Sequence, residues 1–317
     1  MNFIQQAYKG KNEWYHWLVT ILLVFFGWQI LGVFPLVIAV FNVSENLAQF
    51  TEFAQASFMT AGIDKNLFLF LMILSFFIGL IFLFVGVKYV HKRSITSLIT
   101  SREKIDWNRF FYAFFVWGSL AVVMTFIGIY LAPENYTWNF NATPFFILVA
   151  ISLVCIPFQT SLEELLFRGY FMQGIGVLVG NRWVPLLITS VVFGLLHGAN
   201  PEVAKLGQIT MVFYIGTGLL YGITTLMDEG TEIALGLHAV NNITAAFLVT
   251  TDWTVFQTDA LYIDTSEPSV TWQMFIPVFL LYPLMLKIFS KKYAWSNWKE
   301  KLTGAVLVPM TFEEDNL

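Results

Sequence analysis

The sequence has few charged residues and a single cysteine. Charged residues make up 12% of the 317 positions, hydrophobic residues make up 57%, and the formal net charge is only −4. A balance this small, without a basic stripe, argues against a nucleic-acid partner. One cysteine, Cys155, excludes an intrachain disulfide. The low content of charged residues is accompanied by a high content of apolar residues.

Long apolar runs recur along the whole chain. Mean hydropathy is +0.68, and 33 Phe and 11 Trp are present. Runs of about 20 apolar residues suffice to cross a hydrocarbon core of about 30 Å, and in lipid the backbone satisfies its hydrogen bonds as helices. The sequence predicts an all-α, polytopic membrane helical bundle of about eight transmembrane helices. We place them near residues 17–41, 67–90, 110–131, 145 through the Glu163-Glu164 pair, 183–196, 208–226, 233–249 and 272–289.

Lysine and arginine are distributed unevenly between alternate loops. If the N-terminus is inside, two of the 17 basic residues, Lys65 and Lys205, fall in outside segments and the other 15 inside. Cytoplasmic loops carry the excess of such residues. We therefore predict a multi-pass integral membrane protein with both termini cytoplasmic, in the plasma membrane if the source is bacterial.

We divide the chain into three segments. Residues 1–144 hold the first three predicted spans, residues 145–250 a core with the unusual polar residues, and residues 251–317 the last span and a cytoplasmic tail. The tail bears Trp295 and Trp298, and it is expected either along the membrane interface or loosely solvated. His16 and His91 flank spans, so we predict that both are interfacial.

Two adjacent carboxylates, Glu163 and Glu164, follow the apolar run of the fourth span. Ionisable residues inside a membrane are costly, so each is a functional-site hypothesis. Glu164 and Arg168 are spaced i, i+4 and can pair on one helix face, whereas the i+4 neighbour of Glu163 is Phe167. Glu163 is therefore the better candidate for a reactive base. The structural alternative is a solvated, charged turn where the helix leaves the membrane.

Two further motifs contain the remaining histidines. Phe193 precedes His197 by four residues at the end of the fifth span, and His238 precedes Asn242 by four in the seventh. Residues four apart share a helix face. Taken singly, both motifs favour a structural role, because polar side chains on a membrane helix often bond a neighbouring helix.

Helix geometry tests whether these motifs can meet. If the fourth helix continues to a turn at Gly180-Asn181, Glu163 and His197 each lie about 25 Å from that turn. His238 lies only about 12 Å from its own turn near 228–230. For all three to meet, the hairpin of the fourth and fifth helices must project beyond the membrane plane, or the seventh helix must be displaced.

Several protease motifs are absent. No histidine is followed by Glu, no Gly-Asp dipeptide occurs, and no Gly-x-Ser-x-Gly lies in a span. The sequence thus lacks the zinc-binding His-Glu-x-x-His helix, the motif of an intramembrane aspartyl dyad and a serine elbow. A glutamate acting with histidines remains.

The three motifs in order resemble one family. Glu-Glu-x-x-x-Arg at 163–168, Phe-x-x-x-His at 193–197 and His-x-x-x-Asn at 238–242 look like the CAAX protease and bacteriocin-processing (CPBP) family. Its eukaryotic branch is the type II CAAX prenyl endopeptidase, and its bacterial branch is often called Abi. The resemblance covers about residues 145–250.

The resemblance implies an intramembrane endopeptidase that hydrolyses a membrane-associated or lipidated peptide or protein. It implies that Glu163 activates water with help from His197, and that His238 and Asn242 stabilise the oxyanion. The implied supporting residues are Glu164 and Arg168, with Phe193 as the remaining motif position. The expected partners are a peptide substrate and the lipid bilayer, with no nucleic acid.

The cofactor stays open at this point, because family members are described both as metalloproteases and as metal-independent glutamate proteases. Glu163, His197 and His238 could ligate zinc as a His₂Glu set with an open position. In that case Glu164 could be the base.

Two other functions remain as alternatives. One is a proton-coupled or metal-ion transporter that uses the same Glu and His residues. The polar residues cluster at one place, and no paired broken helices are evident, which argues against it. The other is a non-catalytic membrane protein that binds a peptide or confers immunity to one.

Overall fold

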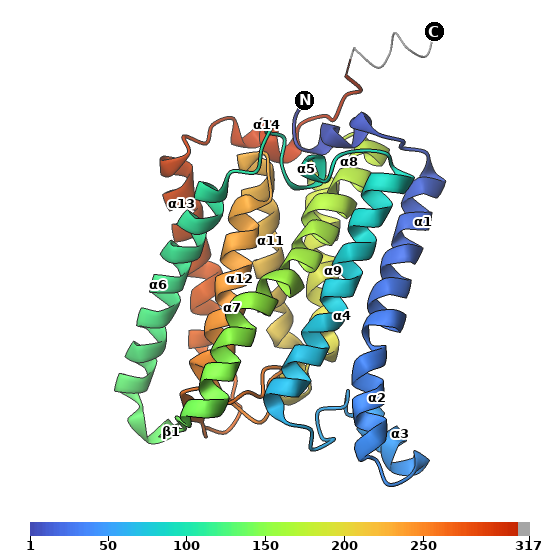
Figure 1. Ribbon diagram of the computed structural model, residues 1–317. Helices are drawn as coiled ribbons and strands as arrows, with labels where there is room; N and C mark the ends of the chain where they lie inside the picture. Colours follow the sequence, from blue (N-terminus) through green and yellow to red (C-terminus); the bar gives the residue numbers. More distant parts are fainter. Residues whose placement is uncertain (310–317) are drawn as a thin grey trace.

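The chain forms a bundle of long apolar helices in the computed structural model, which describes residues 1–309 (Figure 1). Six helices of this part of the chain are long and apolar enough to span a membrane: Trp14–Val43, Lys65–Val90, Trp107–Leu131, Ala142–Val179, Gln208–Asp228 and Trp272–Lys292. Two shorter helices occupy the fifth and seventh predicted positions, at Trp183–Leu196 and Glu232–Phe247. The predicted all-α membrane bundle is confirmed, with two of the eight helices shorter than a full span.

The individual elements subdivide these helices. The α-helices are α1 (Trp14–Phe25), α2 (Phe34–Val43), α3 (Leu47–Gln55), α4 (Lys65–Val85), α5 (Ile95–Ile99), α6 (Trp107–Leu131), α7 (Ala142–Glu164), α8 (Met172–Val179), α9 (Trp183–Leu196), α10 (Pro201–Leu206), α11 (Met211–Asp228), α12 (Glu232–Phe247), α13 (Tyr282–Lys292) and α14 (Trp298–Thr303). The π-helical stretches are Phe26–Gly32, Gly86–Val90, Leu165–Phe171 and Pro277–Leu281. Short 3₁₀ turns are Ile4–Lys9, Pro133–Asn135, His197–Ala199, Gln208–Thr210 and Trp272–Phe275.

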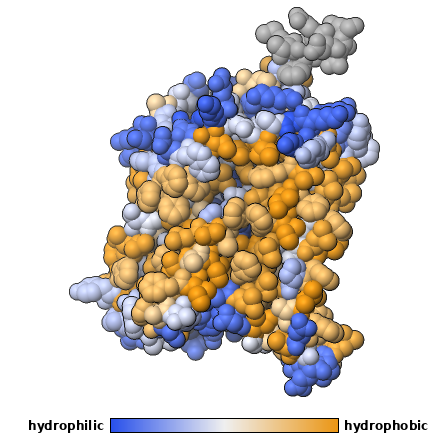
Figure 2. All heavy atoms as spheres, in the orientation of Figure 1, coloured by the Kyte–Doolittle hydropathy of each residue, from blue (hydrophilic) through white to orange (hydrophobic). Residues whose placement is uncertain are grey.

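Figure 2 shows an apolar band across one face of the bundle, between two polar ends. Large hydrophobic side chains in it face outward, among them Leu178 at 84% exposure and Phe146 at 63%. An apolar surface this extensive suits lipid, because soluble monomers rarely expose contiguous patches above a few hundred Å². The molecule is an integral membrane protein.

The two ends of the bundle differ in what they carry (Figure 1). The N-terminus, α5, α8 and α14 lie at one end, here called the terminus end. The other, the sheet end, has α3 and three short strands, β1 (Tyr136–Trp138), β2 (Val249–Thr250) and β3 (Tyr262–Asp264). Their order is β1-β3-β2, with β1 antiparallel and β2 parallel to β3. The sequence analysis did not predict this sheet, since its strands are only two or three residues long.

The fourth helix continues past the two glutamates, as the geometry required. α7, a π-helical turn at Leu165–Phe171 and α8 form one run from Ala142 to Val179. Gly180 then adopts a positive φ of 70°, which glycine allows at low cost, and ends the helix. α9 begins at Trp183, so the predicted turn is confirmed.

The predicted mismatch in height between the two hairpins is resolved in neither of the two ways considered. Arg182, beside the α8–α9 turn, pairs with Glu229 in the α11–α12 turn at 3.1 Å. The two turns therefore lie side by side, and the hairpin does not project. Figure 1 shows α7 running obliquely across the bundle, so distance along this helix exceeds the height it gains.

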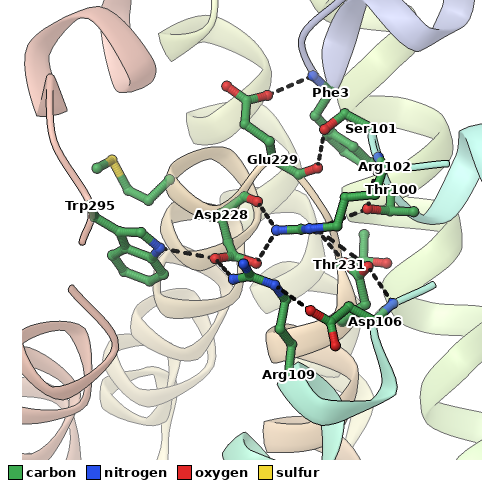
Figure 3. Close-up of polar contacts among 12 residues, drawn as sticks. Phe3, Thr100, Ser101, Arg102, Asp106, Arg109, Asp228, Glu229, Thr231 and Trp295 are labelled. Carbon is green, nitrogen blue, oxygen red and sulfur yellow. Dashed lines mark hydrogen bonds and ion pairs between the residues drawn. The ribbon is translucent and has the colours of Figure 1, made fainter. Parts of the chain in front are cut away.

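A network of ion pairs closes the terminus end (Figure 3). We call Asp228, Glu232, Arg102, Arg109 and Trp295 the terminal junction. Asp228 Oδ1 accepts from Arg109 Nη1 at 2.5 Å and from Trp295 Nε1 at 3.0 Å, and its Oδ2 accepts from Arg102 Nη2 at 2.8 Å. Glu232, whose side chain is fully buried, accepts from Arg102 Nη1 at 3.2 Å. The network joins α6, α11, α12 and the tail.

The described part of the tail packs on the bundle. Trp295 is buried in the terminal junction, and Val306 packs with Ile4 and Leu226. The loosely solvated alternative is therefore wrong for this part. Residues 310–317, which the predicted cytoplasmic tail includes, lie outside the described residues.

His16 and His91 are both buried within the protein, and their position at the membrane interface stays a prediction. His91 is fully buried, with Nδ1 2.7 Å from the Lys11 carbonyl and Nε2 2.8 Å from the Tyr170 hydroxyl. Burial lowers the pKa of His91 from its ordinary 6.5 to about 4. His91 thus helps to join the N-terminal segment to the fourth helix.

Candidate active site

Glu164 lies in a closed, charged pair inside the bundle. Its side chain and that of Arg168 are both fully buried, and Arg168 Nη1 donates to Glu164 Oε1 at 3.1 Å. The predicted i, i+4 ion pair is confirmed. His238 Nδ1 lies 2.8 Å from the same oxygen, so Glu164 holds an imidazole of α12. Arg168 also donates to the Gly218 carbonyl of α11 at 3.1 Å, which joins three helices at this point.

Glu163 faces a different environment, although it is the next residue. Its side chain is 12% exposed, and its Oε1 accepts from Gln159 Nε2 at 2.7 Å. Its Oε2 has no hydrogen bond and lies 3.5 Å from His238 Nε2. One oxygen of Glu163 is thus anchored, and the other is buried without a hydrogen-bond partner.

Gln159 is a site residue that the sequence analysis missed. Besides donating to Glu163, it accepts from Asn242 Nδ2 at 3.1 Å, so it connects α7 with α12. It lies four residues before Glu163. The i, i+4 spacing of Gln159 and Glu163 is a signal in the sequence that identifies Gln159 as a neighbour of Glu163 on the same helix face.

His238 and Asn242 lie on the same face of α12, as predicted. His238 Nε2 and Asn242 Nδ2 are 3.3 Å apart, and the Tyr221 ring stacks on the imidazole with a centroid distance of 5.1 Å. Glu163, Glu164, Arg168, His238 and Asn242 therefore form one contiguous polar cluster.

His197 lies at the end of α9 and stands apart from this cluster. Its Nδ1 donates to the Phe193 carbonyl at 2.7 Å, which leaves Nε2 as the nitrogen that can accept a proton. The ring centroid of Phe193 is 4.6 Å from that of His197 and 6.0 Å from that of His238. Within residues 1–309 no hydrogen bond or ion pair joins His197 to Glu163 or to His238.

A cavity of about 480 Å³ connects the separated residues. Its polar lining includes Glu163, His197, His238 and Asn242 together with Gln159, Asn200, Glu202, Tyr214, Thr217, Tyr221, Asn241, Thr251 and Thr254. Glu164 and Arg168 are not among the residues that line the cavity and lie behind them. A volume of this size accommodates a short stretch of peptide, within the range of ligand pockets in proteins.

A second polar group stands at the far side of the cavity. Tyr214 stacks on the His197 ring with centroids 4.5 Å apart, and its hydroxyl bonds Glu202. Glu202 also accepts from the Val255 amide at 3.1 Å, while Asn200 donates to Glu202 at 3.1 Å. These contacts connect the end of α9, α11 and the loop after β2. The sequence analysis missed them, since the partners lie on different elements and the Val255 amide is 53 residues from Glu202.

The predicted zinc ligands do not come together as a set of three. Among the described residues no three His, Cys, Asp or Glu side chains are grouped as a metal site would require. His238 uses Nδ1 on Glu164, and His197 is separated from it by Phe193. In this arrangement Glu163, His197 and His238 do not fit the predicted His₂Glu set, and zinc stays a prediction.

The fold and the cluster together define a class: a polytopic helical membrane protein with a glutamate–histidine–asparagine site facing an internal cavity. Comparison with known families agrees with this class. Residues 140–244, which run from α7 into α12 and hold every predicted site residue, match the type II CAAX prenyl endopeptidase Rce1-like family. The family predicted from the three motifs is confirmed over this segment.

A similar protein occurs in Bacillus subtilis (strain 168). It is the uncharacterized protein YyaK, 30% identical to this chain over 194 residues. The alignment covers 61% of this chain, which spans 65% of the length of that relative. The comparison with solved structures found no match. The division into segments at residues 144 and 250 remains a prediction.

Proposed function

We propose that this protein is an intramembrane endopeptidase that hydrolyses a peptide bond of a membrane-associated peptide or protein. The observation that carries the proposal is that Glu163 lines the cavity and that its Oε2 is buried without a hydrogen bond, 3.5 Å from His238 Nε2. A buried carboxylate oxygen without a partner is costly unless a ligand or water satisfies it. The match to the Rce1-like family supports the same activity.

In the proposed reaction Glu163 is the general base. Its carboxylate removes a proton from a water in the cavity, and the hydroxide adds to the carbonyl carbon of the scissile bond. The protonated Glu163 then gives that proton to the departing amine as the carbon–nitrogen bond breaks. His197 Nε2 assists by accepting a hydrogen bond from the water across the cavity. The products are a carboxylic acid and an amine.

His238 and Asn242 stabilise the tetrahedral intermediate in this proposal. The Asn242 amide and the Nε2–H of a doubly protonated His238 donate to the oxyanion. His238 Nδ1 meanwhile donates to Glu164, whose pairing with Arg168 holds it in place. Preorganised donors act strongly here because the helices hold them fixed in an apolar surrounding.

Zinc dependence has a direct test. If the chain's own residues perform the reaction as proposed, exhaustive chelation followed by gel filtration leaves cleavage unchanged. A loss of activity that added zinc restores would instead support zinc held by Glu163, His197 and His238, with Glu164 as the base.

The activity is tested with purified protein in nanodiscs, incubated with a mixture of membrane-anchored peptides. Newly formed N-termini are identified by mass spectrometry. We expect cleavage by the wild type and none by Glu163→Gln, while Glu134→Gln, an exposed glutamate at the sheet end, serves as the matched control. Equal sets of new N-termini from the wild type and from Glu163→Gln would overturn the proposal.

A further inference from the structure

The cavity extends from the catalytic cluster toward the sheet end. α12 starts at the terminal junction and leads into β2, so its residues after His238 approach the sheet. The lining follows this path through Ala245 and Val249 to Thr254. At 1.5 Å per residue, the seven steps along α12 from His238 to Ala245 correspond to about 10 Å. The catalytic cluster is therefore at the inner end of a deep cavity.

The opposite side of the cluster is closed. Glu164 and Arg168 are fully buried, and Tyr221 is 2% exposed. Beyond them the terminal junction joins α6, α11 and α12 through Asp228 and Glu232, both buried. Figure 3 shows Asp228 with Arg102, Arg109 and Trp295. Every carboxylate oxygen of these two residues has a donor. A peptide cannot enter from the terminus end without breaking these pairs.

The charges of the two ends indicate which side of a membrane each occupies. Of the 17 Lys and Arg residues, Lys65 and Lys205 lie at the sheet end, Arg168 lies inside the bundle, and the remaining 14 lie at or near the terminus end. The sequence analysis placed Arg168 in an inside segment, whereas the fold places it within the bundle. Without Arg168, the terminus end still has 14 basic residues and the sheet end has two. Positively charged ends face the cytoplasm.

We propose that the cavity opens away from the cytoplasm, so that the substrate is a peptide segment exposed on the outer side of the membrane. The inference about the cavity rests on its shape and on the charge bias. The inference about the location of the substrate rests on the endopeptidase function proposed above. An exported peptide, or the outer segment of a membrane protein, has the required location, whereas a cytoplasmic peptide tail does not.

Cysteine labelling tests the inference without relying on activity. In a Cys155→Ser background, single cysteines are placed at Ser269 near the sheet, at Ser296 near the termini and at Ala245 within the cavity. A charged, membrane-impermeant thiol reagent is applied to right-side-out and to inside-out vesicles. We expect Ser269→Cys and Ala245→Cys to react at least tenfold faster in right-side-out vesicles, and Ser296→Cys to show the reverse. Any other pattern overturns the inference.

Cleavage then tests the inference about the location of the substrate. The same two vesicle types receive a water-soluble peptide that the nanodisc assay has shown to be cleaved. We expect cleavage in right-side-out vesicles only, with Glu163→Gln as the inactive control. Cleavage in inside-out vesicles only would overturn the inference about the location of the substrate. If the nanodisc assay finds no cleavage, the proposed function fails, and the labelling result still decides how the cavity opens.

Discussion

The polar cluster of Glu163, Glu164, Arg168, His238 and Asn242 and the terminal junction are built from the same kinds of residue, but they differ in how fully their carboxylate oxygens are hydrogen-bonded. Each holds two carboxylates near arginine in an apolar bundle, and all of them are buried except Glu163, whose side chain is 12% exposed. In the junction, every oxygen of Asp228 and Glu232 accepts a hydrogen bond. In the cluster, one oxygen of Glu163 and one of Glu164 have none. The junction is closed at the terminus end, whereas Glu163 faces a cavity.

Under the proposed function, this difference separates a structural charge cluster from a reactive one. Complete pairing offsets the cost of removing charges from water, and it leaves no oxygen available for chemistry. An unpaired oxygen retains that cost, and also retains the capacity to take a proton. Substitutions in the two regions should therefore separate activity from stability.

The largest effect is expected from Glu163→Gln. The change preserves shape but removes the base, so we expect cleavage to fall by about 10²–10⁴-fold. Because Gln159 Nε2 still has a carbonyl oxygen to bond, thermal stability in detergent should change by less than about 1 kcal/mol. An equally large loss of stability would show that Glu163 has a structural role.

Asp228→Ala should have the opposite effect to Glu163→Gln, with a large loss of stability and a small change in cleavage. It leaves Arg102 and Arg109 without their shared carboxylate, and removing one partner of a buried pair costs about 3–5 kcal/mol. Because Arg102 is 25% exposed, the lower part of this range is expected. Equilibrium unfolding in mixed micelles measures the change. The folded fraction should keep near-normal cleavage per molecule, and a selective loss of turnover would contradict the comparison.

Gln159→Ala has a smaller expected effect on activity. It removes hydrogen bonds to Glu163 and to Asn242, and a bond to a charged group contributes about 1.5–3 kcal/mol. Cleavage should fall about 10–100-fold, mainly in kcat, since Gln159 orients the base. Gln159→Glu, which replaces the donated bond by repulsion, should be no more active. Wild-type kinetics in Gln159→Ala would show that Glu163 needs no such anchor.

The smallest effect is expected on the pH dependence of stability, through the buried residue His91. The pKa of His91 is about 4, lowered by burial and by nearby Arg93 and His16, while the Lys11 carbonyl and Glu13 act in the opposite direction. Between pH 6.5 and 4 the unfolded chain binds a proton at His91 that the folded chain does not. Stability from this residue therefore falls as the pH drops through that window.

Thermal unfolding in detergent from pH 7.5 to 4.5 measures the effect of His91. The midpoint should decline less with falling pH in His91→Gln than in the wild type. Parallel curves for the two proteins would show that His91 makes no contribution to the pH dependence of stability. Full cleavage by folded His91→Gln is expected at neutral pH, because the residue lies outside the cavity.

Local sequence determined the helices and the i, i+4 pairs. Apolar runs located the spans, Gly180 ended the fourth helix, and the spacing of Glu164 and Arg168 gave their ion pair. These features depend on residues within a few turns of one another, which a single sequence displays. The family motifs at 163–168, 193–197 and 238–242 were equally visible.

Only the tertiary structure decided which groups face the cavity and which are enclosed. It bonded Gln159 to Asn242 across 83 residues and Arg102 to Asp228 across 126, and it buried His91. In the folded chain α7 is also tilted, so that Glu164 contacts His238 although the α8–α9 turn and the α11–α12 turn lie side by side. Such contacts follow from how helices pack and incline, which hydrophobic periodicity along one chain does not specify.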